Sequence, residues 1–384
     1  MQPDQLQSAL IDLDAQGLRR RRRVRDGIQG ARVLLDGREY LSFASNDYLG
    51  LAGHPAIAEA AREAVADCGV GAGAAHLLGG HHRLHEDLER ELAAFVGMPA
   101  ALLFSTGYMA NLGVIQALLD RHGEVFEDRL NHASLVDAAL LSRAKLSRYP
   151  HLDLAALDRQ LAASTAKVKL IASDTVFSMD GDLAPVADLL ALAERHDAWL
   201  HLDDAHGFGV LGERGEGALS RMSSAPRLIY LATLGKAAGV SGAFVAGGVE
   251  LIEWLVNRAR TYVYTTAQPP LLAAAAGASL KLIAAESWRR ERLRALIARL
   301  QAGLAGLNWR LLESRTPIQP LLVGEAQATL ALSEALKRRG ILVPAIRPPT
   351  VPRGTARLRI SLSAAHAEAD VEALIAALRD AAAV

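Results

Sequence analysis

Residues 198–207 are AWLHLDDAHG, and residues 228–236 are LIYLATLGK. Each is a short, almost continuous apolar run, typical of a buried strand, and each ends in polar side chains. Similar runs lie at residues 100–104, 167–172 and 242–247, and helical patterns alternate with them at residues 82–95, 108–119, 134–141 and 185–196. Continuous apolar strands separated by helices predict an α/β fold, with a mainly parallel central sheet that helices cover on both faces.

The chain before and after this region has a different pattern. An amphipathic segment at residues 6–23 precedes two alternating runs at residues 31–45, which flank Asp36-Gly37, a strong hairpin signal. After residue 270 a helical pattern extends to residue 307, and short strands follow at residues 317–323, 341–346 and 356–361. We therefore expect an N-terminal helix and hairpin segment, a large α/β domain and a smaller C-terminal α+β domain, at residues 1–45, 46–270 and 271–384.

Composition excludes several classes of protein. The 384 residues are 51% apolar, and 42 Lys and Arg residues balance 42 Asp and Glu residues, which argues against a disordered chain and a general polyanion binder. Cys68 is the only cysteine, so no intrachain disulfide and no multi-cysteine metal site can form. We expect a cytoplasmic protein with neither a nucleic-acid nor a membrane partner, because no apolar stretch reaches the ~20 residues of a membrane span.

Two motifs with familiar spacing are rejected as ligand sites. Gly207, Gly209 and Gly212 match the pattern G-x-G-x-x-G, but a dinucleotide site also requires a helix at the last glycine and an acidic residue about 20 positions later. The sequence predicts neither feature. His81 and His85 share a helical face without a third ligand, so we expect no metal site there and interpret them as surface or capping histidines.

Asp203 and Lys236 lie at the ends of two predicted strands. In a doubly wound sheet, ligands bind outside the carboxyl ends of the strands, so we expect both side chains to face one crevice. A third strand ends at Phe104, and Ser105-Thr106-Gly107 then leads into a helix whose first amides can hold a phosphate. A lysine, a carboxylate and a phosphate site together match the needs of pyridoxal 5′-phosphate, since they serve its aldehyde, its pyridinium nitrogen and its phosphate.

Five motifs resemble, in order and spacing, those of the α-oxoamine synthases, a group of fold-type I pyridoxal-phosphate enzymes. They are Asn46-Asp47-Tyr48-Leu49-Gly50, Asn131-His132-Ala133-Ser134, Phe177-Ser178-Met179-Asp180-Gly181-Asp182, Asp203-Asp204-Ala205-His206-Gly207 and Thr233-Leu234-Gly235-Lys236. The resemblance extends over nearly the whole chain. It implies a fold-type I transferase with pyridoxal 5′-phosphate as cofactor.

The resemblance also implies roles for single residues. Lys236 would be the Schiff-base lysine, Asp203 the partner of the pyridinium nitrogen, and His132 the residue that stacks on the ring. Ser178 and His206 would hold the side of the ring that carries the phenolic oxygen. The expected catalytic residues are Lys236, His132, Asp203 and His206, and the expected cofactor-binding residues are Gly107, Tyr108, His132, Ser178, Asp203, His206, Thr233, Lys236 and Thr265.

Thr265 belongs to a segment that, in relatives, reaches the phosphate bound by a neighbouring subunit. The resemblance therefore implies a homodimer with shared active sites. The glycine-rich stretch at residues 69–80 departs from the pattern of relatives, which commonly place serine among these glycines. A hydroxyl contact to the cofactor or to the other subunit is consequently in doubt here.

The stretch Ile346-Arg347-Pro348-Pro349-Thr350 resembles the members of the group that join L-alanine to a pimeloyl thioester, with loss of carbon dioxide. The thioester would be pimeloyl-CoA or pimeloyl-acyl carrier protein, and the sequence does not distinguish them. Arg359 is the first choice for the amino-acid carboxylate, because a guanidinium grips two oxygens, and Arg357 stays open as an alternative. The expected substrate-binding residues are Arg21, Asn46, His132, Thr350 and Arg359.

Three other functions remain open at this point. A sister synthase would use glycine in place of alanine, and an aminotransferase would need no thioester. A binding module for a carrier protein or nucleic acid would use the basic run of residues 19–25, which otherwise is a solvated charged face. That run explains none of the chemistry at the strand ends.

Overall fold

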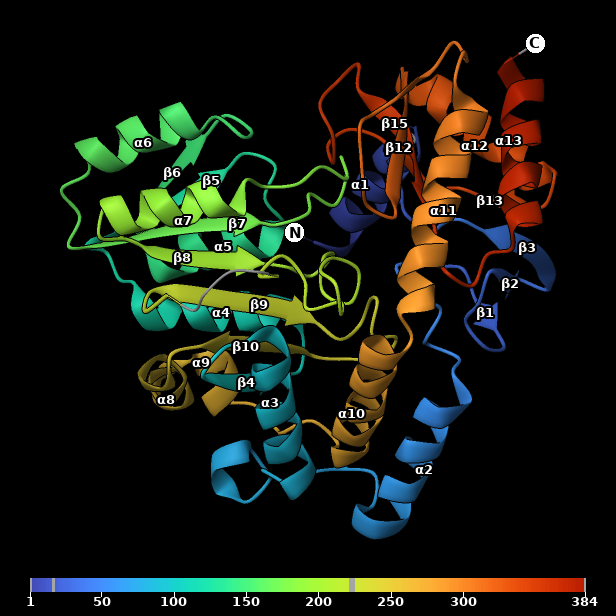
Figure 1. Cartoon of the computed structure of the whole chain (residues 1–384). Helices are drawn as coiled ribbons and strands as arrows, with labels where there is room; N and C mark the ends of the chain where they lie inside the picture. The colour runs from blue at the N-terminus through green and yellow to red at the C-terminus, as the bar shows by residue number, and fades with distance from the viewer. Residues whose placement is uncertain (1, 16–17, 221–224, 383–384) are drawn as a thin grey trace.

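The predicted central sheet forms as one seven-stranded layer in the order β4-β10-β9-β8-β7-β5-β6 (Figure 1). The computed structural model describes residues 2–15, 18–220 and 225–382. The strands are β4 (Ala100–Phe104), β5 (Gly123–Asp128), β6 (Lys145–Tyr149), β7 (Val168–Asp174), β8 (Trp199–Asp203), β9 (Leu228–Thr233) and β10 (Ala243–Gly247). β10 runs in the opposite direction to the other six strands of this sheet, so the prediction of a mainly parallel sheet is confirmed.

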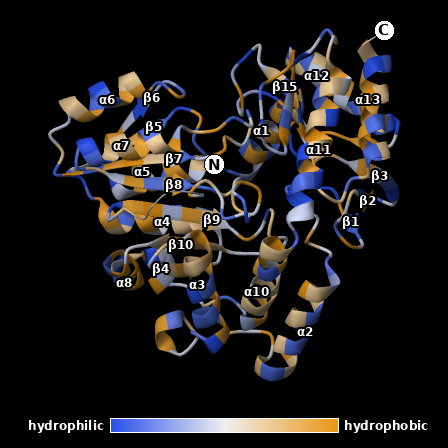
Figure 2. Ribbon diagram, in the orientation of Figure 1, coloured by the Kyte–Doolittle hydropathy of each residue, from blue (hydrophilic) through white to orange (hydrophobic). Residues whose placement is uncertain are grey.

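Helices cover both faces of this sheet, as the continuous apolar strands predict. One face packs against α4 (Gly107–Leu118), α5 (Ala133–Ser142) and α8 (Val249–Arg258). The other face packs against α3 (Arg83–Val96), α6 (Leu154–Ala163), α7 (Val186–Arg195) and α10 (Pro270–Ala285). Figure 2 shows the resulting concentration of apolar residues along the central strands. Burial on both sides stabilises the sheet and leaves its strand ends free to carry polar groups.

Strands β5 and β6 are absent from the elements that the sequence pattern predicts. Glu124 and Glu127 interrupt the apolar pattern of β5, although every residue of this strand is buried. Glu124 is satisfied by Lys145 and Ser147 on β6, at 2.7 and 2.5 Å, and by Ser164 at 2.6 Å. Glu124 finds its partners only in the folded sheet and Glu127 has none in the described structure, and these two buried acids conceal the strand from a hydropathy pattern.

The N-terminal hairpin forms where Asp36-Gly37 predicts it. Asp36 and Gly37 both have positive φ, 51° and 75°, as a tight two-residue turn between antiparallel strands requires. The hairpin strands β2 (Arg32–Leu35) and β3 (Arg38–Ser42) form a sheet with β1 (Arg25–Asp26) and with the distant β13 (Ile341–Leu342), which pairs parallel to β3. The N-terminal helix α1 (Pro3–Ala15) is shorter than the amphipathic pattern, because residues 19–23 are not helical.

A second small sheet contains β11 (Arg310–Leu311), β12 (Ile318–Gly324), β15 (Ala356–Ser361) and β14 (Ala345–Ile346), with α12 (Ala326–Arg338) and α13 (Glu368–Ala382) beside it (Figure 1). The predicted single strand at residues 341–346 is wrong. Its first two residues pair with β3 and its last two with β15, because Pro344 lies between them and cannot donate to a sheet ladder.

The predicted continuous helical run at residues 270–307 is also wrong. It consists of α10 and α11 (Ser287–Leu304), which meet at an angle of 68°. Figure 1 shows α10 beside α2 (Pro55–Cys68) and α3, and α11 beside α13. Among the described residues, no single helix has the length and apolarity to cross a membrane. In the part of the chain that the structure describes, only α10 and α11 joined across their bend reach the length and apolar composition of a membrane span.

Candidate active site

A cavity of about 190 Å³ lies at the carboxyl ends of the central strands. Its lining contains Gly107, Tyr108, His132, Ser134, Asp174, Ser178, Asp203, Ala205, His206, Thr233 and Lys236. The structure thus brings together eight of the nine predicted cofactor residues, all except Thr265. Ser134, Asp174 and Ala205 are additional lining residues that sequence reasoning did not select. Their only signal is position, since Ser134 and Ala205 belong to quoted motifs and Asp174 ends β7.

Lys236 lies in the loop after β9, and its amine is 2.8 Å from Nε2 of His206. Burial lowers the pKa of Lys236 to about 8, while the negative charges of Asp203 and Asp174 oppose this shift. Burial, and then the charge of Lys236, lowers the pKa of His206 well below its usual value. Neutral His206 therefore accepts a hydrogen bond from the lysine ammonium group, and Lys236 loses its proton more readily than a solvated lysine does.

His206 connects Lys236 to a second group of polar side chains. Its Nδ1 lies 2.7 Å from the hydroxyl of Tyr48, and that hydroxyl donates to Oδ1 of Asn46 at 3.1 Å. If His206 accepts from Lys236 at Nε2, its single proton is on Nδ1 and is donated to Tyr48. Arg359 donates to Asn46 Oδ1 at 3.3 Å and to the Tyr48 hydroxyl at 3.5 Å. One consistent set of donors thus extends from the lysine to the arginine.

Arg357 and Arg359 are both buried on β15, but their partners differ. Arg357 forms an ion pair with Asp180 at 2.5 Å. Arg359 donates to the backbone oxygen of Ser178 at 2.6 Å and to Oγ of Ser361 at 2.9 Å, in addition to Asn46 and Tyr48. Within the described part of the chain, Arg359 has no carboxylate partner within 4.0 Å. Its positive charge is therefore open to a carboxylate supplied from outside the protein.

Asp203 ends β8 and is held from two sides. Its Oδ1 accepts from the amide of Ala205 at 3.1 Å, and its Oδ2 accepts from Nδ2 of Asn111 at 2.7 Å. Nearby Asp174 accepts from the amide of His132 at 3.0 Å, while burial and the charge of Asp203 raise the pKa of Asp174 well above its usual value. Asp203 is thus a fixed carboxylate that can pair with a cationic ring nitrogen.

The N-terminus of α4 forms the opposite wall. Thr106 caps this helix, its Oγ1 accepting from the amide of Met109 at 3.1 Å. Because the first amides of a helix lack intrahelical acceptors, Gly107 and Tyr108 offer donors to an anion, and α4 is long enough to contribute its dipole. Thr233, at the end of β9, also lines the cavity. The reactive amine, fixed carboxylate and anion site of this cavity fit pyridoxal 5′-phosphate.

Five predicted site residues do not line this cavity within a single chain. Asn46 and Arg359 lie next to it, through their contacts with Tyr48 and Ser178. The other three are Arg21, Thr350 and Thr265. Arg21 is exposed and lies 3.5 Å from Asp14. Thr350 is exposed in a turn, where its amide donates to the backbone oxygen of Arg347 at 3.0 Å. Thr265 follows α9 (Arg260–Val263) and is half-buried, but it is not among the lining residues.

The glycine motif that was rejected as a dinucleotide site lies in turns, and the histidines have hydrogen-bond partners of their own. Gly207, Gly209 and Gly212 lie in turns after β8, and no described helix begins there. His85 uses both ring nitrogens, one to accept from the amide of His82 at 3.0 Å and one to donate to the backbone oxygen of Gln268 at 2.9 Å. His82 caps α3 and His85 completes its capping box, although His85 is buried rather than on the surface. The structure also brings His76 to His81 and His85, with one ring nitrogen of each within 4.8 Å of the others, so the sequence argument that a third ligand is missing is wrong.

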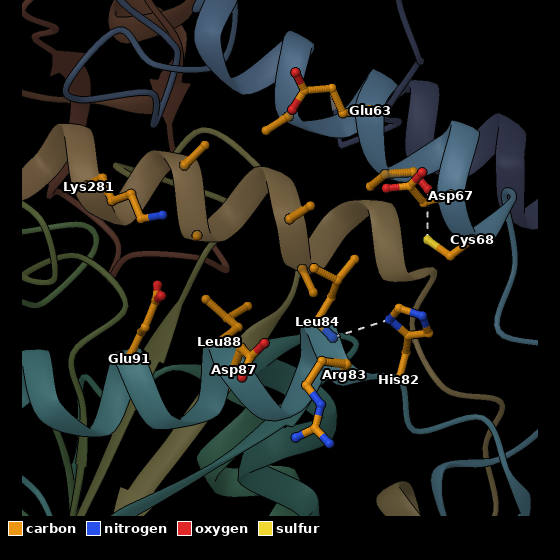
Figure 3. A pocket seen from close by; sticks show the side chains of 16 residues that line it. Glu63, Asp67, Cys68, His82, Arg83, Leu84, Asp87, Leu88, Glu91 and Lys281 are labelled. Carbon is orange, nitrogen blue, oxygen red and sulfur yellow. Dashed lines mark hydrogen bonds between the residues drawn. The ribbon is translucent and has the colours of Figure 1, made fainter.

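A larger cavity of about 500 Å³ lies elsewhere, between α2, α3 and α10 (Figure 3). Figure 3 shows Glu63, Asp67, Asp87 and Glu91 around it, with Lys281 at one end. It shares no lining residue with the cavity at Lys236. Size alone therefore does not identify the chemical site in this molecule.

Comparisons with known proteins agree with this geometry. Residues 38–378 match the family model described as aminotransferase class I and II. The chain is 62% identical over 379 residues to the 8-amino-7-oxononanoate synthase of Nitrosomonas europaea, covering 98% of both chains. It is also 62% identical over 371 residues to the enzyme of the same name from Thiobacillus denitrificans, covering 96% of both chains.

Solved structures share the fold over most of their length. Serine palmitoyltransferase of Sphingomonas wittichii has a TM-score of 0.92 at 29% identity, with 98% of this chain and 96% of that chain covered. A serine palmitoyltransferase solved with PLP has a TM-score of 0.91 at 28% identity, over 98% and 96% of the two chains. The 8-amino-7-oxononanoate synthase of Francisella tularensis has a TM-score of 0.78 at 30% identity, over 89% and 97%.

Proposed function

The chain belongs to the aminotransferase class I and II family of fold-type I PLP enzymes, with its similar relatives among the 8-amino-7-oxononanoate synthases, and from this we infer that it makes 8-amino-7-oxononanoate for biotin biosynthesis. It is a PLP-dependent acyltransferase. L-alanine and a pimeloyl thioester are its substrates. A bond forms between Cα of alanine and the acyl carbon, the thioester C–S bond breaks, and the carboxyl group of alanine leaves as carbon dioxide.

The contact between Lys236 and His206 carries this proposal. When bound, pyridoxal 5′-phosphate supplies an electron sink that stabilises negative charge at the substrate Cα. The amine of Lys236, with a pKa near 8, is a base suited to removing the Cα proton near neutral pH. His206 holds this amine at 2.8 Å, and its neutral ring accepts a hydrogen bond from the amine when the lysine is charged.

Arg359 is our proposed anchor for the carboxylate of alanine. A buried guanidinium without a protein carboxylate is a strong site for a small anion, since folding has already removed the guanidinium from water and only the carboxylate loses water on binding. Its fixed contacts to Asn46 and to the backbone of Ser178 orient its plane. Arg357 is less suited, because Asp180 already neutralises its charge.

His132 lies on the cavity wall and is proposed to stack on the cofactor ring and to contact the substrate. Arg21 and Thr350 are proposed to meet the pimeloyl chain or its carrier when the ends of the protein close around the substrates. The carrier is pimeloyl-CoA or pimeloyl-acyl carrier protein. Salt should weaken the attraction of the basic run at residues 19–25 for an acidic carrier.

A second copy of the chain is proposed to complete the site at Thr265. The exposed apolar side chains Val70, Leu77, Leu78 and Tyr264 are between 51% and 80% exposed, and Tyr264 is adjacent to Thr265 in the chain. The two segments that carry them are joined, because the amide of Ala267 donates to the backbone oxygen of Ala74 at 3.0 Å. An exposed apolar patch of this kind supports an interface in a cytoplasmic homodimer.

The decisive experiment supplies the holoenzyme with L-alanine and pimeloyl-CoA and follows thiol release together with product mass. We expect 8-amino-7-oxononanoate and free CoA in equal amounts, no product from Lys236→Ala, and little turnover with glycine. Preference for glycine would identify a sister synthase instead. Amino-group transfer without thioester consumption would identify an aminotransferase.

A further inference from the structure

A group of buried polar side chains lies behind the cavity wall. Asn111 on α4 is 1% exposed and His201 on β8 is fully buried. Nδ2 of Asn111 donates to Asp203 Oδ2 at 2.7 Å and to Ser134 Oγ at 2.8 Å, while Oδ1 of Asn111 lies 2.7 Å from Nε2 of His201. Neither Asn111 nor His201 lines the cavity. A single side-chain amide thus contacts three neighbours, two of which do line it.

The direction of each hydrogen bond in this group follows from charge. If the amide were reversed, its oxygen would face the carboxylate of Asp203, so repulsion fixes the nitrogen toward Asp203 and Ser134. The oxygen then faces His201, which must donate. Burial lowers the pKa of His201 to about 4, so its ring carries one proton at neutral pH. Since Nδ1 of His201 is buried without a partner in the described structure, this proton belongs on Nε2.

The same amide also acts on His132 through Ser134. The hydroxyl of Ser134 accepts from Asn111, so its own proton is free for Nδ1 of His132 at 2.7 Å. The amide of Ser134 also donates to Nδ1, at 3.3 Å. When neutral, His132 therefore carries its ring proton on Nε2, the nitrogen that Ser134 does not contact.

We propose that Asn111, oriented by His201, is a positioning residue that fixes the carboxylate of Asp203 and, through Ser134, the ring proton of His132. This inference rests on the proposed function, because the cofactor and substrate of that function are what Asp203 and His132 would contact in the cavity. Both carboxylate oxygens of Asp203 would be oriented before the cofactor binds. His132 would present an Nε2–H donor. Neither Asn111 nor His201 takes part in a chemical step.

Cofactor retention tests the branch to Asp203. Asn111→Leu, which is similar in size, should release pyridoxal 5′-phosphate from the holoenzyme at least ~10-fold more readily, the effect of losing one buried hydrogen bond to a charged group. Ser134→Ala removes the branch to His132 but leaves the bond from Asn111 to Asp203, so it should lose less cofactor than Asn111→Leu does. Release is measured by equilibrium dialysis with the absorbance of the bound cofactor as readout. Equal retention by Asn111→Leu and wild type would overturn this branch.

The orienting role of His201 has a matched pair of variants. Glutamine offers an N–H at a similar reach to Nε2 of histidine, whereas leucine offers none. We expect His201→Gln to retain the cofactor within about 2-fold of wild type and His201→Leu to approach Asn111→Leu, with ~10-fold weaker retention. If His201→Leu and His201→Gln behave alike, His201 only fills space. This comparison remains informative if Asn111→Leu does not fold.

The position of the His132 proton is a readout independent of activity. In holoenzyme labelled with ¹⁵N-histidine, long-range proton–nitrogen spectra distinguish an Nε2–H from an Nδ1–H ring. We expect His132 to be Nε2–H in wild type and to become a mixture in Ser134→Ala and Asn111→Leu. An unchanged tautomer in both variants would overturn the branch to His132. Failure of the proposed function would instead appear in wild type, as absence of the alanine-dependent product.

Discussion

At the scale of single residues, the sequence predicts the reactive groups better than their supports. Lys236 and Asp203 are recognisable because each follows an apolar strand, and the sheet brings the ends of such strands together. Asn111 and His201 carry no such signal. Asn111 is one position in a helical pattern and His201 one position in an apolar strand, so only the folded contacts show that they meet at 2.7 Å.

Arg357 and Arg359 should respond differently to the same change. Arg359→Gln removes the open positive charge, so we expect the KM for L-alanine to rise at least ~10-fold, with cofactor binding retained. Arg357→Gln leaves the carboxylate of Asp180 without its cation and should lower the melting temperature with little effect on this KM. Steady-state kinetics and thermal denaturation measure both. The reverse pattern would assign the substrate carboxylate to Arg357.

Lys236 should make cofactor capture depend on pH. Only the unprotonated amine is nucleophilic, and the pKa of Lys236 is lowered to about 8 by burial. The rate at which apoenzyme incorporates the cofactor should therefore rise with pH up to about 8 and then level off. Borohydride trapping at successive times, followed by mass measurement, gives this rate. A rise that continues to pH 10 would show that the amine is not perturbed.

Glu127 should make stability depend on pH in the opposite sense to most carboxylates. Its two oxygens are buried without partners in the described structure, and burial raises its pKa from 4.5 to about 8. The folded state keeps a proton that the unfolded chain releases, so this contribution is full below pH 4.5 and is lost as pH rises to about 8, at ~1.4 kcal/mol per pH unit. Urea unfolding between pH 5 and 9 should show a shallower decline in Glu127→Gln than in wild type. Parallel curves would contradict this expectation.

At the scale of elements, the sequence pattern is reliable where burial alone decides the structure. Residues 228–233 form β9 as predicted, because every residue except the last is buried and apolar. The pattern fails where polar residues are buried within the sheet, as in β5, and where one apolar run serves two sheets, as at residues 341–346. Arrangement in space, which these patterns do not encode, decides those cases.

The loop that carries Lys236 depends on Gly239. This glycine has φ +68°, and a Cβ there would lie 2.4 Å from the backbone nitrogen of Ala52. Gly239→Ala should therefore destabilise the protein by ~2 kcal/mol or more and separate this loop from the segment that holds Tyr48. Gly235→Ala is the matched control, since its Cβ would meet only Thr233 Oγ1 at 3.5 Å. Equal unfolding midpoints for the two variants would refute the steric argument.

At the scale of the whole molecule, a single chain leaves the apolar patch around Leu78 uncovered. Leu78 is 80% exposed, so an aspartate there costs the folded monomer little but would place a charge inside the proposed interface. We expect Leu78→Asp to shift the protein toward monomers in sedimentation. Its enzyme activity should fall as the fraction of dimer falls. Leu6→Asp, on α1, changes an exposed leucine outside the patch and should do neither. A wild-type monomer with full activity would remove the need for a second copy.

The pairing of β3 with β13 also determines the order in which the protein can be completed during synthesis. Leu41 emerges from the ribosome among the first residues, but its sheet partner Ile341 is translated 300 residues later. Meanwhile the central sheet, from β4 to β10, is available to fold as soon as its own residues have emerged. The first hairpin made is therefore among the last parts to be finished, and one edge of it stays unpaired until translation nears its end.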